Sequence, residues 1–485
     1  MSTSGTINQS VVSLVDEHKL KRPISEESED RISSLPDELR TKIVSCLPFE
    51  DAFKTCILSK SWKHIFSTLP KLSFRENRFP NVANRVRRFA ALVDWTLANY
   101  EGSEIESLEI RFNILKKSCV QLRNAWVHFA IEHNVRRLEL HGKINARQGL
   151  PTSLFTCESL TEFSLAANTQ LLKLPSAINL PNLTSLSLIA VIFPDDTLTE
   201  ALFAGCPLLT GLYIGRCNMF RLARLTISCP KLEGICFSNC MEIDTCTIVL
   251  EGSCVKKFVY DGSLPRNFEF GNMVSLWTAI LNLRRDIEDG RNDTELAPVA
   301  LNLLRSMCHA RDLTLSALFN EVLPKLGGEP LQLGCFENLK IARLYVWATY
   351  ANQEIVMTLL SKFHRVEILR LIIHRPYTMN GMYRVRMYPN KERLEGLLRH
   401  LLVLQIDNYD SNPLETIFLE FFLENAMYLT EVNINVPRVP FTPDEDRYRS
   451  LTNWLPLVTA YDLKAISEEY PNTLITISDL PRTIF

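Results

Sequence analysis

The densest group of chemistry-bearing side chains is a set of seven cysteines between Cys206 and Cys254. Cysteine thiolates bind zinc, so this density raises the hypothesis of a structural zinc site. The separations are 11, 12, 7, 4, 6 and 8 residues, with no Cys-x-x-Cys pair and no histidine among them. Short zinc-binding segments use such pairs. The spacing therefore favours thiols that act as small buried side chains, and we expect no metal.

Motifs for catalysis and for nucleotide binding are missing from the sequence. It contains no phosphate-binding glycine loop, no zinc-protease helix and no nucleophile-elbow serine. We therefore expect a protein that is not an enzyme and needs no cofactor.

The composition indicates a folded protein in a reducing compartment. The 485 residues are 46% hydrophobic and 22% charged, with a net charge of −2, so no basic field exists to hold nucleic acid or an anionic membrane. The 13 cysteines are odd in number, and the chain shows no secretory leader and no apolar stretch of about 20 residues. We expect a cytoplasmic or nuclear protein, with a polar, disordered leader at residues 1–30.

Three short helices are predicted in the next segment, RISSLPDELRTKIVSCLPFEDAFKTCILSKSWKHIFSTLPKLSF. Ser34 and Asp37 have the spacing of a capping box at the start of the first helix. The second helix is expected to begin near Glu50 and the third at Ser59. One apolar stripe recurs every four residues along the first helix, at Leu35, Leu39, Ile43 and Leu47. Three helices of this size form a marginal core, so their apolar faces are expected to need a partner.

This segment resembles an F-box, particularly its plant form. The residues that carry the resemblance are Leu35-Pro36 with Leu39, Ile43, Leu47-Pro48, Asp51-Ala52, and Leu58-Ser59-Lys60 with Trp62. Phe49 departs from the pattern, because a small polar residue is more usual there. The alternative is an ordinary three-helix cap with its leucine stripe facing inward.

The resemblance implies a partner. An F-box binds a Skp1-like linker and through it joins a cullin–RING ligase. The residues expected to form this site and the F-box core together are Leu35, Pro36, Leu39, Ile43, Leu47, Pro48, Leu58, Ser59 and Trp62.

A leucine-rich pattern, Leu-x-x-Leu-x-Leu, repeats beyond residue 100. Its six clearest copies start at Val135, Leu160, Leu183, Leu209, Leu232 and Val255. The spacings of 23 to 26 residues lie inside the range of leucine-rich repeats. Such a pattern alone often arises by chance in an apolar chain. The repeats therefore need support from other residues that recur at a fixed distance from the first leucine of each copy.

Two registers support the repeats. Three cysteines stand three residues before the first leucine of their copy, at Cys157, Cys206 and Cys229. Four small polar or thiol residues stand eight residues after it, at Asn168, Cys217, Cys240 and Ser263. At that position the chain turns inward after its strand, and such a side chain can bond buried backbone groups of the neighbouring coil. Lys143 and Val191 occupy the same position in their copies and are not small polar or thiol residues.

The expected fold is α/β: an F-box module followed by a solenoid with a parallel sheet on its concave face and helices outside. The clearest helix is PDDTLTEALFAGCP, with a capping box at Thr197 and Glu200 and an end at Gly205. Residues 284–295 are expected to be a charged loop. The expected parts are 31–75, F-box; 76–134, a helical linker and first irregular repeat; 135–265, leucine-rich repeats; and 266–485, degenerate repeats and a C-terminal cap.

The repeat sequences resemble those of plant F-box proteins with leucine-rich repeats (RNI-like). The stretch LEFFLENAMYLTEVNINV resembles the FBD-like helix and strand near the C-terminus of many such proteins. The resemblance implies the substrate-recognition subunit of an SCF-type (Skp1–cullin–F-box) E3 ubiquitin ligase, with the repeats holding an unknown substrate protein. The alternative is a ligand-binding leucine-rich-repeat receptor or scaffold that acts outside a ligase.

Overall fold

The computed structural model describes residues 31–78, 85–112, 117–142, 149–286, 290–326, 333–347, 353–374, 389–409, 413–437, 470 and 473–480. The predicted leader at residues 1–30 lies outside them. The chain divides into two compact units, Met1–Leu222 with Thr226–Cys229 and Ala223–Leu225 with Pro230–Phe485. Among the described helices, none has the length and apolar character needed to cross a membrane.

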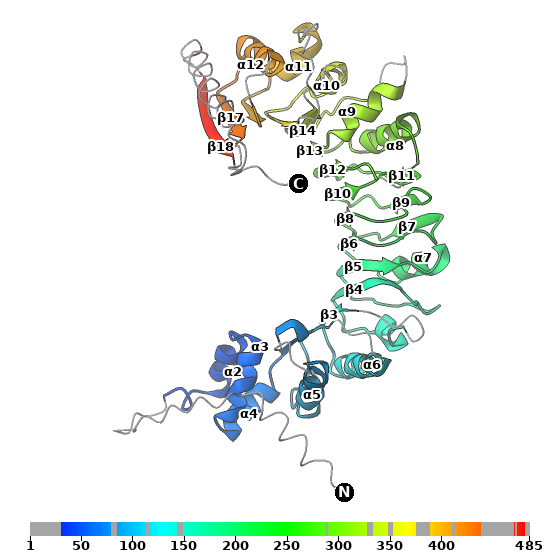
Figure 1. The fold of residues 1–485 in the computed structure, drawn as a ribbon, viewed down its shortest axis with the longest axis vertical. Coiled ribbons are helices and arrows are strands. Elements are labelled where there is room, and N and C mark those ends of the chain that lie inside the picture. The colour runs from blue at the N-terminus through cyan, green and yellow to red at the C-terminus, as the bar shows by residue number, and fades with distance from the viewer. Residues whose placement is uncertain are drawn as a thin grey trace, which may run out of the picture. The chain divides into compact units, whose positions relative to one another are not determined.

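Three short helices open the first unit, as the sequence predicts (Figure 1). They are α2 (Asp37–Ser45), α3 (Phe49–Lys54) and α4 (Lys60–Ser67). Pro36 and Pro48 stand at the N-caps of α2 and α3, and Ser59 caps α4 by accepting a hydrogen bond from the backbone N–H of Trp62 at 3.3 Å. The predicted capping box of Ser34 is wrong. Ser34 Oγ donates instead to the Arg31 carbonyl at 2.9 Å, because α2 begins too far along the chain for it to reach.

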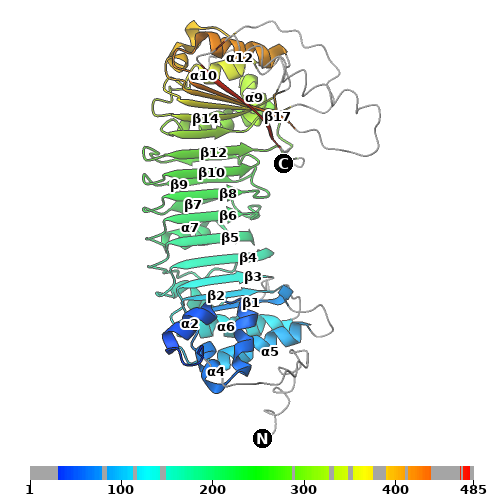
Figure 2. The same cartoon turned by 90° about the vertical axis from the view of Figure 1, so that its left-hand side faces the viewer.

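A parallel sheet forms the rest of the first unit. Its strands pair in the order β1 (Lys71–Arg75), β2 (Ser107–Arg111), β3 (Arg137–His141), β4 (Glu162–Leu171), β5 (Ser185–Ile192) and β6 (Gly211–Gly215). Figure 2 shows β3 to β6 side by side, pointing the same way. The connections contain α5 (Arg85–Ala98), α6 (Lys117–Glu132) and α7 (Asp196–Ala204). Alternate residues are buried along β1 and β3, so these strands have one covered face and one open face.

The second unit is built on the same principle. Its parallel sheet has the order β8 (Gly234–Ser238), β10 (Lys257–Gly262), β12 (Thr278–Leu283), β13 (Asp312–Leu315), β14 (Ile341–Trp347), β15 (Ile368–His374), β16 (Val403–Asp407), β17 (Glu431–Pro437) and β18 (Leu474–Leu480). Its helices are α8 (Asp293–Ser306), α9 (Leu318–Val322), α10 (Gln353–Leu360), α11 (Glu395–Leu398) and α12 (Pro413–Asn425). The predicted C-terminal helix and strand are α12 and β17.

The predicted repeats are confirmed. In each of the six copies a strand begins two residues after the first Leu or Val. For example, β5 follows Leu183 and β8 follows Leu232. The regular spacing fixes the strand register, because every copy buries the same positions against its neighbours.

Three connections differ from the expected helices. They form the short strands β7 (Arg224–Ser228), β9 (Thr247–Glu251) and β11 (Asn267–Phe270), and β9 pairs with β11 in parallel. The helix α7 lies in a 26-residue spacing, between Leu183 and Leu209, whereas β7 and β9 lie in 23-residue spacings. A helix rises only about 1.5 Å per residue and a strand about 3.3 Å, so the shorter connections cross the repeat as extended chain.

Two helix starts also differ from prediction. At α7 the capping box of Thr197 is wrong, because Asp195 Oδ1 accepts the backbone N–H of Leu198 at 2.9 Å; Gly205 ends the helix as predicted. A true capping box opens α8: Asn292 Oδ1 accepts the N–H of Glu295, and Glu295 Oε2 accepts the N–H of Asn292. Residues 293–295, expected in a loop, are therefore the first turn of α8.

Three cysteines of the first unit bond to backbone oxygens. Cys217 Sγ donates to the carbonyl of Leu188 in the preceding coil at 3.3 Å, which is the role predicted for its position. Cys206 and Cys229 donate to Leu202 and Phe203 carbonyls at 3.2 and 3.5 Å. Burial raises the pKa of all three thiols to about 12, so they stay protonated.

Asn168 is an exception among the turn residues. It is exposed, has a positive φ of 50° and lies in a register shift of β4, while the neighbouring Ala167 is buried. Within the part of the chain that the structure describes, the cysteines are free thiols, and no cluster of His, Cys, Asp or Glu side chains could hold a metal ion.

Candidate protein-binding surface of the helical module

An aromatic cluster holds the three helices against the first repeat. Phe49 of α3 lies 4.8 Å from Phe74 of β1 and 5.4 Å from Phe66 of α4, ring centroid to centroid. Phe53 packs edge-on against Trp95 of α5 at 5.4 Å. Aromatic pairs in this geometry add to the gain from apolar burial. Part of the partner that the marginal helical core needs is therefore supplied by the chain's own repeats.

The opposite side of the helices exposes apolar side chains. Six large ones face solvent on the described part of this module: Ile32, Leu39, Ile43, Leu47, Ile57 and Leu58. We call this set the apolar surface. Leu58 is 67% exposed and Leu39 is 45% exposed. An exposed apolar group of this size on a small module marks an interaction site.

The orientation of α2 explains why its stripe faces outward. Arg40 and Val44, each one residue after a member of the stripe, are buried at 7% and 1% exposure. A helix turns about 100° per residue, so burying these two positions moves Leu39 and Ile43 toward solvent. The alternative of an inward leucine stripe is wrong at Leu39, Ile43 and Leu47.

Trp62 fixes the inner side of the module. It is 6% exposed, and its indole N–H donates a hydrogen bond to Ser33 Oγ at 2.9 Å. The guanidinium of Arg40 lies over the ring at 5.6 Å, donates to Ser61 Oγ at 2.6 Å and pairs with Asp37. Trp62 therefore holds the segment before α2 and the helix α2 itself in place.

The structure divides the nine predicted site residues by exposure. Seven of them are exposed: Pro36, Leu39, Ile43, Leu47, Pro48, Leu58 and Ser59. Leu35 is half-buried and Trp62 is buried, so their positions suit the core. Direct contact of any of the nine with a partner stays a prediction.

Two exposed apolar residues were not among the predicted site residues. Ile32 lies before α2 and Ile57 lies beside Leu58 in a short 3-10 turn, Thr55–Ile57. Ile57 could have been found from its position, since two adjacent apolar residues at a helix end cannot both face a core this small. Ile32 follows polar sequence and gives no such signal.

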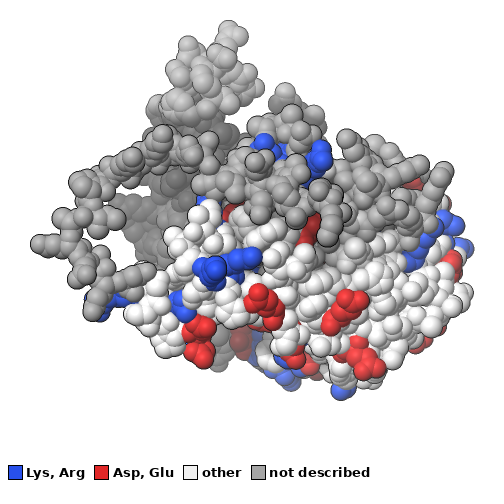
Figure 3. Space-filling model, turned by 90° about the horizontal axis from the view of Figure 1, so that it is seen from below, with Lys and Arg blue, Asp and Glu red and all other residues white. Residues whose placement is uncertain are grey.

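Charged residues are scattered at this end of the first unit. Figure 3 shows the face seen from below, where uncharged surface predominates between separate acidic and basic side chains. Desolvating such a surface costs less than desolvating a dense charge cluster.

An ion pair joins β1 and β2 of the first sheet. Arg75 donates to Glu109 through Nε at 2.9 Å and Nη2 at 2.8 Å, and Ser73 Oγ donates to the same carboxylate at 2.7 Å. Burial acts to raise the pKa of Glu109, but these hydrogen bonds outweigh it and hold the pKa below its ordinary value. The carboxylate is therefore a fixed negative charge that orients Arg75.

Comparisons with known proteins match both parts of the chain. The F-box domain family matches residues 32–74, and the LRR repeats of FBD-associated F-box protein At5g56370 match residues 123–276. The F-box/LRR-repeat protein At3g26922 of Arabidopsis thaliana is 30% identical over 239 residues, which cover 48% of this chain and 76% of that protein. This chain belongs to the F-box/LRR-repeat family.

A longer match covers most of this F-box/LRR-repeat protein. The F-box/FBD/LRR-repeat protein At2g04230 of Arabidopsis thaliana is 26% identical over 443 residues, 89% of this chain and 95% of that protein. FBD-associated F-box protein At4g10400 of the same plant is 31% identical over 212 residues, 43% of this chain and 51% of that protein. The predicted resemblance to plant F-box proteins with leucine-rich repeats is confirmed. The F-box match spans α2 to α4 and ends on β1, so it contains the whole apolar surface.

Proposed function

We propose that this F-box/LRR-repeat protein is the substrate-recognition subunit of an SCF-type E3 ubiquitin ligase. The F-box binds a Skp1-like linker, and the repeats bind the substrate protein. The observation that carries the proposal is the apolar surface, because the F-box family assignment and the exposure of Leu39, Ile43 and Leu58 fall on the same 43-residue segment.

Burial of the apolar surface against a linker supplies the binding energy. A Leu or Ile side chain gains about 1.5 to 3 kcal/mol when fully buried. These side chains are 40% to 67% exposed in the free chain, so burying the rest of each one in an interface gains roughly half of that free energy. The aromatic cluster holds the helices in place beforehand, which lowers the ordering cost of association.

The mechanism is proximity and involves no covalent chemistry by this chain. The linker and cullin hold the receptor near a ubiquitin-charged enzyme, and the repeats hold the substrate near both. The local concentration of substrate lysines around that enzyme then rises. We place this function in the cytosol or nucleus, where free thiols such as Cys217 stay reduced.

A three-component pull-down tests the proposal. The chain is co-expressed with a Skp1-like protein and a cullin, and the purified chain is probed for the cullin. We expect the cullin to co-purify only when the linker is present. Leu39→Asp with Leu58→Asp should abolish this recovery. Phe220→Asp, which changes an equally exposed apolar residue in the repeats, is the matched control and should leave it unchanged.

Failure of the unchanged chain to recover linker or cullin would contradict the ligase proposal and favour the scaffold alternative. If the double substitution does not reduce recovery of the cullin, the assignment of the apolar surface as the linker-binding site is contradicted.

A further inference from the structure

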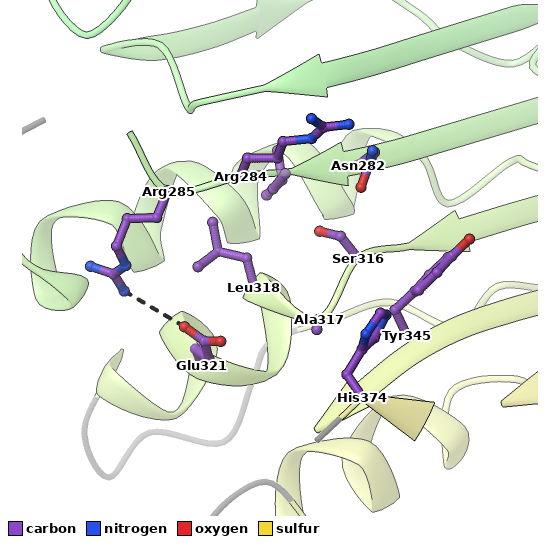
Figure 4. Close-up of a pocket in the computed structure, with 10 residues that line it drawn as sticks. Asn282, Arg284, Arg285, Ser316, Ala317, Leu318, Glu321, Tyr345 and His374 are labelled. Atoms are coloured by element: carbon purple, nitrogen blue, oxygen red, sulfur yellow. Dashed lines mark ion pairs between the residues drawn. The ribbon is translucent and has the colours of Figure 1, made fainter. Parts of the chain in front are cut away.

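A pocket of about 420 Å³ opens on the second unit where strands β12 to β15 end (Figure 4). Its wall includes Asn282 and Arg284 on one side and Tyr345 and His374 on the other, with Leu318 between them. The strand register aligns the ends of these strands, since Leu281 pairs with Leu315 and Leu315 with Leu344. A volume of this size accommodates a few side chains or a small ligand.

Ser316 provides a buried hydroxyl in this pocket. Its side chain is 6% exposed, and Oγ makes no hydrogen bond to any residue that the structure describes. Figure 4 shows the hydroxyl between the arginines and the two rings. A buried hydroxyl without a partner costs free energy, so such groups usually have a ligand or a functional role. This hydroxyl is therefore available to donate to an acceptor that enters the pocket.

Two guanidinium groups supply positive charge at the mouth. Arg284 is 52% exposed and pairs with Asp261 through Nε at 3.0 Å and Nη2 at 3.4 Å, so the N–H donors of Nη1 stay outside this pair. Arg285 pairs with Asp293 and lies 3.8 Å from Glu321, a separation too long for a hydrogen bond. An entering carboxylate can therefore form charge-assisted bonds to Arg284 without breaking its pair with Asp261.

The remaining wall is apolar and aromatic. The rings of Tyr345 and His374 stack with centroids 5.5 Å apart and planes 21° from parallel. Burial lowers the pKa of His374, so its imidazole is neutral at pH 7 and adds no charge. Leu318 and Ala317 are 7% and 9% exposed and form an apolar base. The pocket thus combines an apolar base with cationic donors on one side.

We propose that this pocket binds a substrate segment in which an acidic side chain, Asp or Glu, lies next to a large apolar side chain. The apolar side chain packs on Leu318 and the Tyr345 ring. The carboxylate accepts hydrogen bonds from Arg284 and from the Ser316 hydroxyl. This proposal rests on the proposed function, because it specifies which substrates the repeats recognise.

Hydrogen-bond donors decide in favour of an acidic segment. Both arginines of the lining already pair with carboxylates, but Arg284 keeps the N–H groups of Nη1 outside its pair with Asp261, and the Ser316 hydroxyl has no partner among the described residues. A basic segment would meet both guanidinium groups, and a purely apolar one would leave the Ser316 hydroxyl unsatisfied.

Selection from a random dodecapeptide phage library tests the proposal. The bait is the full chain bound to its Skp1-like linker, and the linker alone serves for subtraction. An enriched peptide is then synthesised in its acidic form and with Glu→Gln or Asp→Asn, and binding is measured by fluorescence anisotropy. We expect enriched peptides to share an acidic residue beside an apolar one. Arg284→Ala and Ser316→Ala should each weaken the acidic peptide about tenfold or more.

Arg399→Ala is the control, because Arg399 is an exposed arginine on the turn after α11 that pairs with Glu395 and does not line the pocket. It should leave affinity unchanged. Three results would overturn the proposal: no enriched peptide, enriched peptides without acidic residues, or affinity that is unchanged by both pocket substitutions. Since the bait is already bound to the linker, each of them leaves the ligase proposal intact.

Discussion

Phe49 packs edge-on against Phe74, with ring centroids 4.8 Å apart and planes at 71°. Phe49 belongs to the helix α3 and Phe74 to β1, the first strand of the sheet. Both are nearly fully buried. The departure from the usual small polar residue at position 49 thus has a structural reason: the aromatic ring fastens the F-box to the sheet.

Phe49→Ala should destabilise the first unit. The substitution removes a buried ring and leaves a cavity between α3 and β1, which costs about 3 to 5 kcal/mol. Urea unfolding followed by circular dichroism measures the change. Leu58→Ala, at an exposed position, should alter the free energy of unfolding by less than about 0.5 kcal/mol. Equal effects of the two substitutions would contradict the assignment of inner and outer sides.

Ser59 acts as a helix cap whether or not it touches a linker. Ser59→Ala removes the acceptor for the Trp62 N–H and should lower stability by about 1 kcal/mol. Ser59→Asp supplies another good cap, so the melting temperature of this variant should stay close to that of the unchanged chain. A stable Ser59→Asp variant that has lost linker binding would reveal a direct contact of this residue, separate from its capping role.

The buried thiols predict a loss of stability at alkaline pH. A thiol with an ordinary pKa near 9 in the unfolded chain deprotonates before the folded thiols of Cys206, Cys217 and Cys229, whose pKa burial raises to about 12. Their contribution is complete below pH 9 and is lost as pH rises from 9 to 12, by up to about 1.4 kcal/mol per pH unit for each thiol. Cys217→Ser should make the decline shallower, since serine does not titrate there. A free energy of unfolding that does not change between pH 9 and pH 12 would refute the predicted loss of stability.

Ser316→Ala should leave the free protein as stable as before or slightly more stable. The hydroxyl has no hydrogen-bond partner among the described residues, so its removal ends a desolvation cost and breaks none of the bonds that the structure shows. Thermal unfolding of the chain without peptide measures this. A loss of more than about 1 kcal/mol would show that the hydroxyl has a structural partner in solution.

The sequence predicts strands well where the spacing is regular. All six leucine copies from Val135 to Val255 place a strand, and the later segments such as FHRVEILRLII do so as well. The strand β12, which no leucine copy marked, and the short strands β9 and β11 escaped prediction. Five-residue apolar segments have too few positions to separate a strand period from a helix period.

The candidate surfaces were predictable to different degrees. Leu39 and Leu58 follow from the F-box resemblance. The exposure of Leu39 depends on the burial of Arg40, and a charged residue gives no sign of burial in the sequence. The pocket around Ser316, Tyr345 and His374 draws on three strands at irregular spacing, so only the paired strands bring these residues together.

The linker-binding role of the apolar surface is tested by the affinity of the purified chain for a Skp1-like protein, measured by isothermal titration calorimetry. We predict that Leu39→Asp weakens binding about 100-fold or more, because it places a charge in an interface that buries apolar side chains. The matched Phe220→Asp variant should bind within about threefold of the unchanged chain. The proposed linker-binding role of the apolar surface is contradicted if Leu39→Asp unfolds at the same urea concentration as the unchanged chain and binds the linker with the same affinity.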